Sequence, residues 1–424
     1  MLQKTDSAVF SAAPEVISTF EHAGKGYALE CVNSGENMQN MREQWIALET
    51  RCSEKYTYFQ TFDWCMKWVN AYVSEPSKNQ LDIPQVFVLR DADPSGEDDV
   101  LMIWPLFKTR SRAGTKVLIT LGEPQGQYSG ILCDREHFSV ELGKKVYEQI
   151  RASIECDALT LNFFAENSII AQILDGEGFL DKSEQKSMIL DLEGMESWES
   201  YRNTLASSNR KQRNKRRNKL NKMGDVTYKV YSSGEPEFRE LVRKCLAMKQ
   251  VWMEQTGRRE DVMTEPAMAE FLSSLGDPET ANPNNDAFMH VLALDAVPVA
   301  MEMGMAFQGH YYSFLGAINM DFQKLSPGKI QIEMAQEWAK EQGLKKFDFL
   351  NDPSGYKATW TDEKQPLRSQ YVPISSAGYL YCWMWKTSIK PKLKNMYQNI
   401  RPDDRRFINH LFKFVGKLQG KSSG

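Results

Sequence analysis

The residues best suited to chemistry lie between positions 299 and 360, where single polar residues interrupt apolar segments. Glu302 is the one acid in the apolar segment 299–305. An apolar cleft raises the pKa of a carboxyl group toward the value that suits a general base. Side chains alternate between the two faces of a strand, so a solvent-facing Glu302 is the alternative.

Other candidates follow on the next predicted strands. Tyr311 and Tyr312 are adjacent on a strand, so they point to opposite faces and one of them can face a bound ligand. Asp348 lies in the apolar segment 347–350 and has the same two interpretations as Glu302. We expect His290 and His310 to be structural.

The turn between the last two predicted strands has the composition of an anion site. Ser326 is a residue type that caps helices, Pro327 suits the first helical position, and Gly328 allows close approach to the backbone. Free N–H groups, the helix dipole and Lys329 favour a pyrophosphate here, with Leu325 as the preceding residue. A capped helix with nothing bound is the alternative.

The elements that must position these residues follow from the hydrophobic pattern. In the second half a predicted helix begins at a glycine turn and ends at Gly343, and antiparallel strands precede this helix. The first half shows a weaker version of the same order, which indicates a duplicated α/β (α+β) fold. The second half is predicted to have helices at 198–223, 236–256, 265–275 and 326–342, and strands at 226–230, 288–294, 297–307, 310–318 and 346–350. The first half is predicted to have helices at 38–52, 61–73, 138–154 and 168–174, and strands at 86–90, 100–107, 116–121 and 158–163.

Bulk properties narrow the function classes. The chain has 424 residues, which is enough for two domains, and its net charge of −4 is not that of a polycation built for nucleic acid. Seven widely spaced cysteines without a C-x-x-C and five histidines argue against a disulfide framework and against a metal centre. No signal peptide and no run of 18 apolar residues is visible, so we expect a cytoplasmic protein.

Two segments are basic. Eight Lys and Arg residues and no acid lie within 210–222, spread around the predicted helix. This helix is either simply solvated or binds an anionic partner such as a nucleotide-sugar, CoA phosphates, polysaccharide or RNA, although the lack of aromatics weakens the RNA version. The tail 376–424 has ten Lys and Arg residues against two Asp, with aromatics, so it either contacts a membrane peripherally or docks on the body.

Several of these motifs together resemble the GNAT acetyltransferase superfamily. They are Leu325-Ser326-Pro327-Gly328, Gly343, Phe347-Asp348-Phe349-Leu350, Tyr356-Lys357 and Trp360. They are most similar to the CelD-like branch, which is associated with bacterial cellulose and exopolysaccharide clusters and related to the FemAB transferases. Weaker matches in the first half include Phe59-Gln60-Thr61, Trp104-Pro105-Leu106 and Trp198 with Tyr201. The resemblance covers roughly 45–375 and is most specific over 298–360.

The resemblance implies two tandem GNAT-like domains, each a mixed, mostly antiparallel sheet flanked by helices. We place a flexible leader at 1–26, the domains at 27–195 and 196–375, and a helical tail at 376–424. Acetyl-CoA, or another acyl-CoA, would be the cosubstrate, with its pyrophosphate at Leu325–Lys329 of the second domain alone. The family's Gln/Arg-x-x-Gly-x-Gly/Ala loop is absent, and Ser326-Pro327-Gly328-Lys329 stands in its place.

The resemblance also implies roles and a reaction. The expected activity is transfer of an acyl group to the amine of an amino sugar or a cell-envelope or polysaccharide precursor, by direct attack in a ternary complex. The alternatives are a FemAB-like transferase that uses aminoacyl-tRNA and a non-catalytic GNAT-like binding scaffold. The expected catalytic residues are Glu302, Tyr312 and Tyr356, and the expected substrate-binding residues are Tyr311, Asp348 and Lys357.

Overall fold

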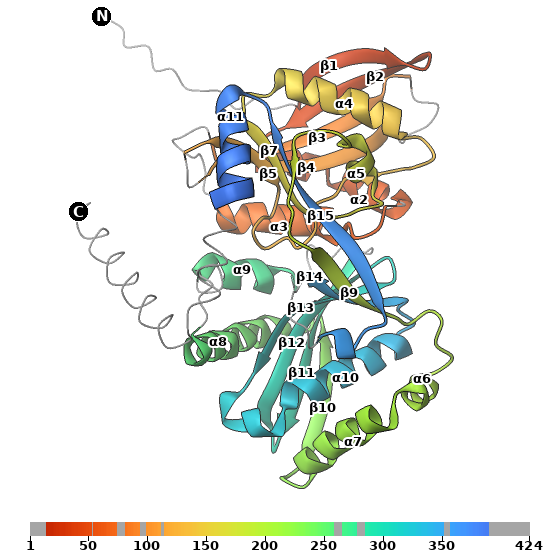
Figure 1. Ribbon diagram of the computed structural model, residues 1–424, viewed down its shortest axis with the longest axis vertical. Helices are drawn as coiled ribbons and strands as arrows, with labels where there is room; N and C mark the ends of the chain where they lie inside the picture. The colour runs from red at the N-terminus through yellow and green to blue at the C-terminus, as the bar shows by residue number, and fades with distance from the viewer. Residues whose placement is uncertain are drawn as a thin grey trace, which may run out of the picture. The chain divides into compact units, whose positions relative to one another are not determined.

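A computed structural model describes residues 14–52, 54–73, 81–93, 99–111, 114–257, 265–277, 285–351 and 357–389. The chain divides into two compact units, and Figure 1 labels most of their helices and strands. Unit 1 comprises the chain up to Gln185 together with Pro366–Thr387, and unit 2 contains Lys186–Gln365. Each unit is built on a mixed sheet with helices packed against it.

Unit 2 has the strand order β10-β11-β12-β13-β14-β9. Neighbouring strands from β10 to β13 are antiparallel, β13 and β14 are parallel, and β9 is antiparallel to β14. The strands are β9 (Gln185–Asp191), β10 (Val226–Ser232), β11 (Asn285–Leu294), β12 (Val297–Phe307), β13 (His310–Ile318) and β14 (Lys346–Asn351).

Two tight turns fix the register of β11, β12 and β13. Asp295 and Ala296 form the first turn with φ of 50° and 64°, and Gln308 and Gly309 form the second with φ of 49° and 79°. Left-handed backbone at both central positions matches the right-handed twist of a hairpin. The two-residue gaps between the strands predicted at 288–294, 297–307 and 310–318 are confirmed as turns, and the register places Glu302 opposite His290 on β11 and Gly316 on β13.

The parallel pair β13–β14 is short. It joins residues 310–312 to 346–348, although β13 continues to Ile318 and β14 to Asn351. The two strands therefore separate toward their carboxyl ends. In the same place β14 carries a bulge against β9, with Leu350 at a φ of 62°. A bulge re-aims the side chains beside it, which is common next to functional sites.

Helix α10 follows β13 and packs on β11, β12 and β13. Its Trp338 contacts the rings of Phe288, His290 and Tyr311. Helix α8 packs against β13, and α9 packs against α8. The helices of unit 2 are α6 (Trp198–Thr204), α7 (Ser207–Asn221), α8 (Phe238–Thr256), α9 (Pro266–Ser274) and α10 (Pro327–Glu341), with the 3-10 turns η4 (Met320–Leu325) and η5 (Lys357–Thr359).

The single helix predicted at 198–223 is wrong, because α6 and α7 are separate. Leu205 and Ala206 have extended backbones, with ψ of 145° and 139°. At the end of α6 the hydroxyl of Thr204 donates a hydrogen bond to the carbonyl of Tyr201. Serine and threonine compete with the backbone for hydrogen bonds in this way, so they favour helix ends.

Unit 1 repeats the strand arrangement of unit 2. Antiparallel strands run from β1 to β5, β5 and β7 pair in parallel over only 117–119 and 158–160, and β15 is antiparallel to β7. Phe163 on β7 has a φ of 56° beside a register shift, and its N–H donates to the hydroxyl of Ser369. The main strands are β1 (Glu15–His22), β2 (Lys25–Val32), β3 (Ile83–Asp91), β4 (Val100–Arg110), β5 (Lys116–Thr120), β7 (Ala158–Ala165) and β15 (Glu363–Pro373). The helices are α1 (Gly35–Asn40), α2 (Arg42–Arg51), α3 (Phe62–Tyr72), α4 (Val140–Ser153), α5 (Ile169–Ile173) and α11 (Ser376–Leu380).

Three predictions differ from the observed structure of unit 1 or from its boundaries. The leader predicted at 1–26 is wrong from residue 15, because β1 pairs with β2 through a tight turn at Ala23 and Gly24. The helix predicted at 38–52 is interrupted at Met41, which ends α1 and precedes α2. The domain boundaries predicted at 195/196 and 375/376 differ from the division into units, since residues 367–373 of β15 pair with β7.

The cysteines and the hydropathy of the helices add two general observations. All seven cysteines are buried and free of disulfides. Among the helices that the structure describes, none has the length and apolar composition needed to span a membrane. The tail is helical at α11 and the following π-helical turn Tyr381–Ile389, and residues 390–424 lie outside the described part of the chain.

Candidate functional site

Glu302 lies buried in the middle of β12, with 4% of its surface exposed. Its Oε1 accepts a hydrogen bond from the hydroxyl of Tyr311 at 3.0 Å. Burial raises the pKa of Glu302 to about 7, against the opposing effects of hydrogen bonds from Tyr311 and Ser313 and the charge of Lys357. The solvent-facing alternative is therefore excluded, and a carboxyl group with this pKa exchanges its proton near neutral pH.

Tyr311 reaches Glu302 by lying across Gly304. A β-carbon at Gly304 would overlap the tyrosine hydroxyl, so only glycine fits beneath this side chain. The Tyr311 ring is fully buried and stacks on Phe347 at 4.8 Å between ring centroids. The structure thus gives this predicted substrate-binding residue a partner within the protein, and its hydroxyl orients the carboxyl group of Glu302.

His290 stands opposite Glu302 on β11 and is also buried. The hydroxyl of Tyr228 lies 2.6 Å from its Nδ1, while its Nε2 has no hydrogen-bond partner within the described residues. Burial lowers the pKa of His290 to about 3, so the ring is neutral. Sequence reasoning missed Tyr228, and the one available signal was its position on a strand of alternating polar and apolar residues.

Tyr312 and Asp348 occupy the last paired position before β13 and β14 separate. Both are buried. The carboxylate of Asp348 accepts hydrogen bonds from the Ser187 hydroxyl and, at 2.7 Å, from the N–H of Leu350. Asp348 thereby holds the bulge in β14. Ser313, the next residue of β13 after Tyr312, is half-buried.

Lys357 joins the group around Glu302. Its Nζ donates to the carbonyl of Phe349 at 2.7 Å and lies 5.5 Å from the centre of that ring. Its charge lowers the pKa of Glu302, in opposition to the effect of burial. The structure thus brings Glu302, Tyr311 and Lys357 together, whereas Tyr356 lies outside the described residues.

The turn at 325–329 differs from the predicted cap. Pro327 is the first residue of α10 as predicted, but Ser326 has left-handed backbone, with φ 56° and ψ 47°, and its side chain makes no capping hydrogen bond. The N–H of Ser326 donates to Gln323 and that of Lys329 to Ser326. Proline has no N–H, so Gly328 carries the one N–H of residues 326–329 without a backbone acceptor in the described structure.

Helix α7 places its basic residues in two environments. Arg213 is buried, stacks on Trp360 at 4.0 Å, and lies 3.8 Å from the carboxylate of Glu333 on α10. Arg217 pairs with Glu333 and Glu337 at 3.7 and 2.9 Å. This face of the helix is therefore structural. Of the remaining basic side chains, those of Lys211, Lys215 and Lys219 are exposed, and those of Arg210 and Arg216 are half-buried.

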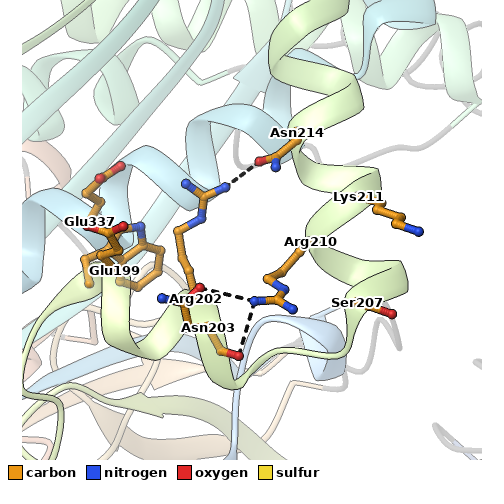
Figure 2. Close-up of a pocket in the computed structure, with 9 residues that line it drawn as sticks. Glu199, Arg202, Asn203, Ser207, Arg210, Lys211, Asn214 and Glu337 are labelled. Atoms are coloured by element: carbon orange, nitrogen blue, oxygen red, sulfur yellow. Dashed lines mark hydrogen bonds between the residues drawn. The ribbon is translucent and has the colours of Figure 1, made fainter.

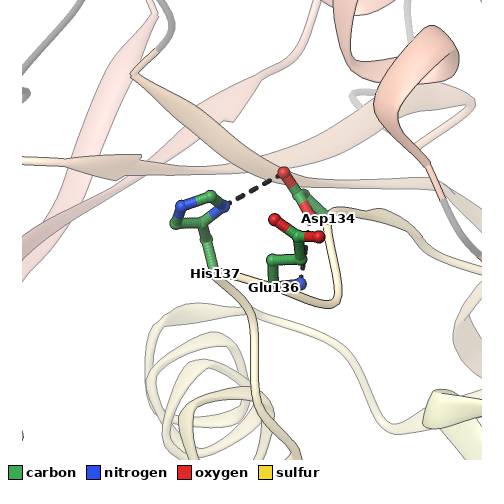
Figure 3. A group of neighbouring side chains, drawn as sticks. All are labelled: Asp134, Glu136 and His137. Atoms are coloured by element: carbon green, nitrogen blue, oxygen red, sulfur yellow. Dashed lines mark hydrogen bonds and ion pairs between the residues drawn. The ribbon is translucent and has the colours of Figure 1, made fainter.

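A second polar cluster lies in unit 1, where Asp134, Glu136 and His137 approach one another (Figure 3). Asp134 accepts a hydrogen bond from the N–H of Glu136 at 3.0 Å, lies 3.1 Å from Nδ1 of His137, and pairs with Arg51 at 3.9 Å. Glu136 and His137 are exposed. These contacts describe a hydrogen-bonded surface loop, so we assign no metal to it.

Residues 207–358 match the acetyltransferase (GNAT) domain family. The matched segment runs from α7 to the start of η5 and includes the whole of β10–β14 with α8, α9 and α10. It therefore contains Glu302, Tyr312 and the turn at 325–329. None of the curated proteins compared with the chain matches it.

Solved structures with a similar fold span both units. FemX is 12% identical, with a TM-score of 0.54 over 81% of this chain and 98% of its own. A domain described as the C-terminal part of a lysylphosphatidylglycerol synthetase from Agrobacterium fabrum is 12% identical, with a TM-score of 0.51 over 82% and 95%. A conserved protein from Bacteroides thetaiotaomicron is 11% identical, with a TM-score of 0.50 over 81% and 99%. These likenesses concern the fold. The predicted fold class, a mixed and mostly antiparallel α/β sheet flanked by helices, is confirmed, and the match to the GNAT domain lies within unit 2.

Proposed function

We propose that the protein is an acyl-CoA-dependent N-acyltransferase whose cosubstrate enters unit 2 where β13 and β14 separate. The observation that carries this proposal is the three-residue pairing of these strands within the segment that matches the GNAT domain. The start of α10 lies at the same end, since a β-carbon on Gly328 would stand 2.9 Å from the side chain of Ile318, the last residue of β13. An extended thioester can thus reach from the helix start into the opening.

The phosphates belong at Leu325–Lys329 in this proposal. The N–H of Gly328 is available to donate a hydrogen bond to a phosphate oxygen, and the exposed side chain of Lys329 supplies a positive charge beside the helix dipole. Because only one N–H of this turn is free in the described structure, it offers fewer hydrogen bonds to a phosphate than a glycine-rich loop does. The match of the GNAT domain to residues 207–358 supports one cosubstrate site, in unit 2.

The reaction is attack of an amine nitrogen on the thioester carbonyl carbon. A C–N bond forms, the C–S bond breaks, the amine loses a proton and the CoA thiolate gains one. We assign the amine proton to Glu302, whose pKa of about 7 suits a base at neutral pH. Ser313 is half-buried, is the first residue of β13 beyond the pairing with β14, and hydrogen bonds to Glu302, so it can relay this proton.

Tyr312 stands at the last paired position beside the opening and is our candidate for protonating the thiolate. Tyr356, Asp348 and Lys357 remain proposals for the acceptor side. The acceptor that we favour is the amine of an amino sugar or of a cell-envelope or polysaccharide precursor in the cytoplasm, because the sequence resembles the CelD-like branch that is associated with cellulose and exopolysaccharide clusters.

A second candidate function is aminoacyl transfer from charged tRNA, as in FemAB-like enzymes. The exposed basic face of α7 and the structural likeness to FemX favour this candidate. A scaffold without catalysis is the third interpretation. A binding experiment distinguishes the two catalytic functions, because the first uses acyl-CoA as its donor and the second uses aminoacyl-tRNA.

The test measures the thermal midpoint of the protein with acetyl-CoA and, separately, with aminoacyl-tRNA. We expect acetyl-CoA to raise the midpoint, because a ligand that binds the folded state stabilises it. Lys329→Glu should weaken this shift, whereas Lys364→Glu, a charge reversal on another exposed lysine of unit 2, should leave it unchanged. Stabilisation by the charged tRNA alone would transfer the proposal to the second function, and no response to any acyl-CoA would remove the first.

A further inference from the structure

A cavity of about 490 Å³ lies between α6 and α7, and the proposed reaction does not use it (Figure 2). Its basic lining consists of Arg202 from α6 with Arg210 and Lys211 from the first turn of α7. A cavity of this size accommodates a small molecule rather than a single ion. The cavity is therefore large enough for a ligand that carries an anionic group on a larger body.

The two arginines of the cavity are held in place by amide side chains. Nη2 of Arg202 donates to Oδ1 of Asn214 at 2.6 Å, and Nη1 of Arg210 donates to Oδ1 of Asn203 at 3.1 Å (Figure 2). Nε of Arg202 also lies 3.3 Å from the carboxylate of Glu333, and each guanidinium group keeps further N–H donors. A planar group of donors fixed in this way suits the oxygens of a phosphate.

The cavity also contains a buried donor without an acceptor. Trp198 is 6% exposed and lines the cavity, and its indole Nε1 has no hydrogen-bond partner within the described residues. A buried N–H that is left without a partner costs free energy. A ligand with acceptor oxygens would satisfy Trp198, so this second observation also indicates a ligand rich in oxygen.

The acidic residues of the lining do not cancel its positive charge. Glu337 is already paired with Arg217 at 2.9 Å. Glu199 is exposed at the start of α6. Glu333 lies outside the lining and pairs with Arg202 as well as with Arg213 and Arg217. With these groups included, three carboxylates face five cations, so the charge around the cavity stays positive.

The cavity is separate from the proposed cosubstrate site. It contacts α10 at Glu337, ten residues along the helix from Pro327, which corresponds to about 15 Å at the rise of an α-helix. Helix α7 also runs past α10 in the reverse direction, since Lys219 near its end reaches the carbonyl of Lys324. The first turn of α7 thus lies far from the start of α10.

We propose that the cavity between α6 and α7 is a binding site for the phosphate group of a phosphorylated small molecule, with Arg202, Arg210, Lys211 and the indole N–H of Trp198 as its donors. A phosphate supplies a negative charge for the positive lining and acceptor oxygens for the donors that remain. The volume beyond the phosphate holds the group that it esterifies.

The experiment titrates the full chain by calorimetry with inorganic phosphate, pyrophosphate and glucosamine 6-phosphate, and with glucosamine as the uncharged comparison. We expect the phosphorylated sugar to bind and glucosamine not to bind. Arg210→Gln and Lys211→Gln should each weaken binding about tenfold, the contribution of a charged hydrogen bond. Lys215→Gln, one turn further along α7 and outside the lining, should bind like the wild type.

Two further measurements place the site. Glu199→Gln should tighten binding, because it removes a carboxylate that repels the phosphate. Saturating CoA should leave the titration unchanged, because the two sites are separate. The proposal is overturned if no phosphate-bearing probe binds, if Arg210→Gln and Lys211→Gln bind as tightly as Lys215→Gln, or if CoA displaces the probe.

Discussion

The raised pKa of Glu302 makes the stability of the protein depend on pH in a defined window. The folded state holds its proton up to about pH 7, whereas the unfolded chain loses it near the ordinary value of 4.5. Between these values the folded state binds the additional proton, so the free energy of unfolding falls as the pH rises. Below this window both states are protonated and above it both are ionised, so the contribution changes only inside it.

The magnitude follows from the width of the window. A shift of about 2.5 pH units at about 1.4 kcal/mol per unit corresponds to about 3 kcal/mol. Glu302→Gln keeps the shape of the side chain and cannot ionise. Subtracting the variant from the wild type therefore cancels all other titrations, and this difference in unfolding free energy should fall by about 3 kcal/mol from pH 4.5 to pH 7.

The assay is urea unfolding at a series of pH values, followed by circular dichroism, for the wild type and each variant. Glu196→Gln, which changes an exposed acid, is the matched control and should give a flat difference. Tyr311→Phe removes a hydrogen bond that lowers the pKa of Glu302, so the window should extend to higher pH. A flat difference for Glu302→Gln would mean that the carboxyl group titrates normally and would refute both the raised pKa and its use as a base.

Three further predictions concern single contacts. Gly304→Ala places a methyl group on the hydroxyl of Tyr311 and should lower the free energy of unfolding by about 1–3 kcal/mol in urea titrations; an unchanged value would show that Tyr311 does not cross this position. Glu333→Gln leaves Arg202, Arg213 and Arg217 without their shared buried carboxylate and should cost about 3 kcal/mol, against less than about 1 kcal/mol for Glu337→Gln at the half-exposed end of the cluster; equal costs would contradict the central place of Glu333. Ser313→Ala should lower kcat about tenfold while the affinity for acetyl-CoA stays constant, and full activity would remove the relay through Ser313.

Local signals predicted the elements around the site well. Short turns separate the strands between residues 288 and 318, and Gly343 has the positive φ that ends a helix. The residues at these turns and at the helix end were therefore sufficient to predict where the elements begin and end. Contacts between residues on different strands could not be predicted from the sequence. The contact between Tyr311 and Glu302 depends on the register and on the space above Gly304, neither of which has a sequence signature.

The missed strands and the misread cap have physical reasons of their own. β15 contains Glu363, Lys364 and Arg368 and is only weakly apolar, and its partner β7 lies about 200 residues earlier in the chain. Ser326 has the residue type of a cap, but its left-handed backbone directs the side chain away from the helix N–H groups. Residue type alone indicates which cap could form, whereas the preceding turn η4 decides which one does.

The return of β15 to unit 1 has a consequence for biosynthesis. Leu367 pairs with Ala165, so the sheet of unit 1 stays incomplete until the ribosome has translated about 200 residues beyond β7. During that time β7 exposes an unpaired edge, which is a site for pairing with other chains. The nascent protein therefore needs protection at β7 for longer than its N-terminal position suggests, and a chain that ends before residue 366 would release unit 1 with that edge permanently open.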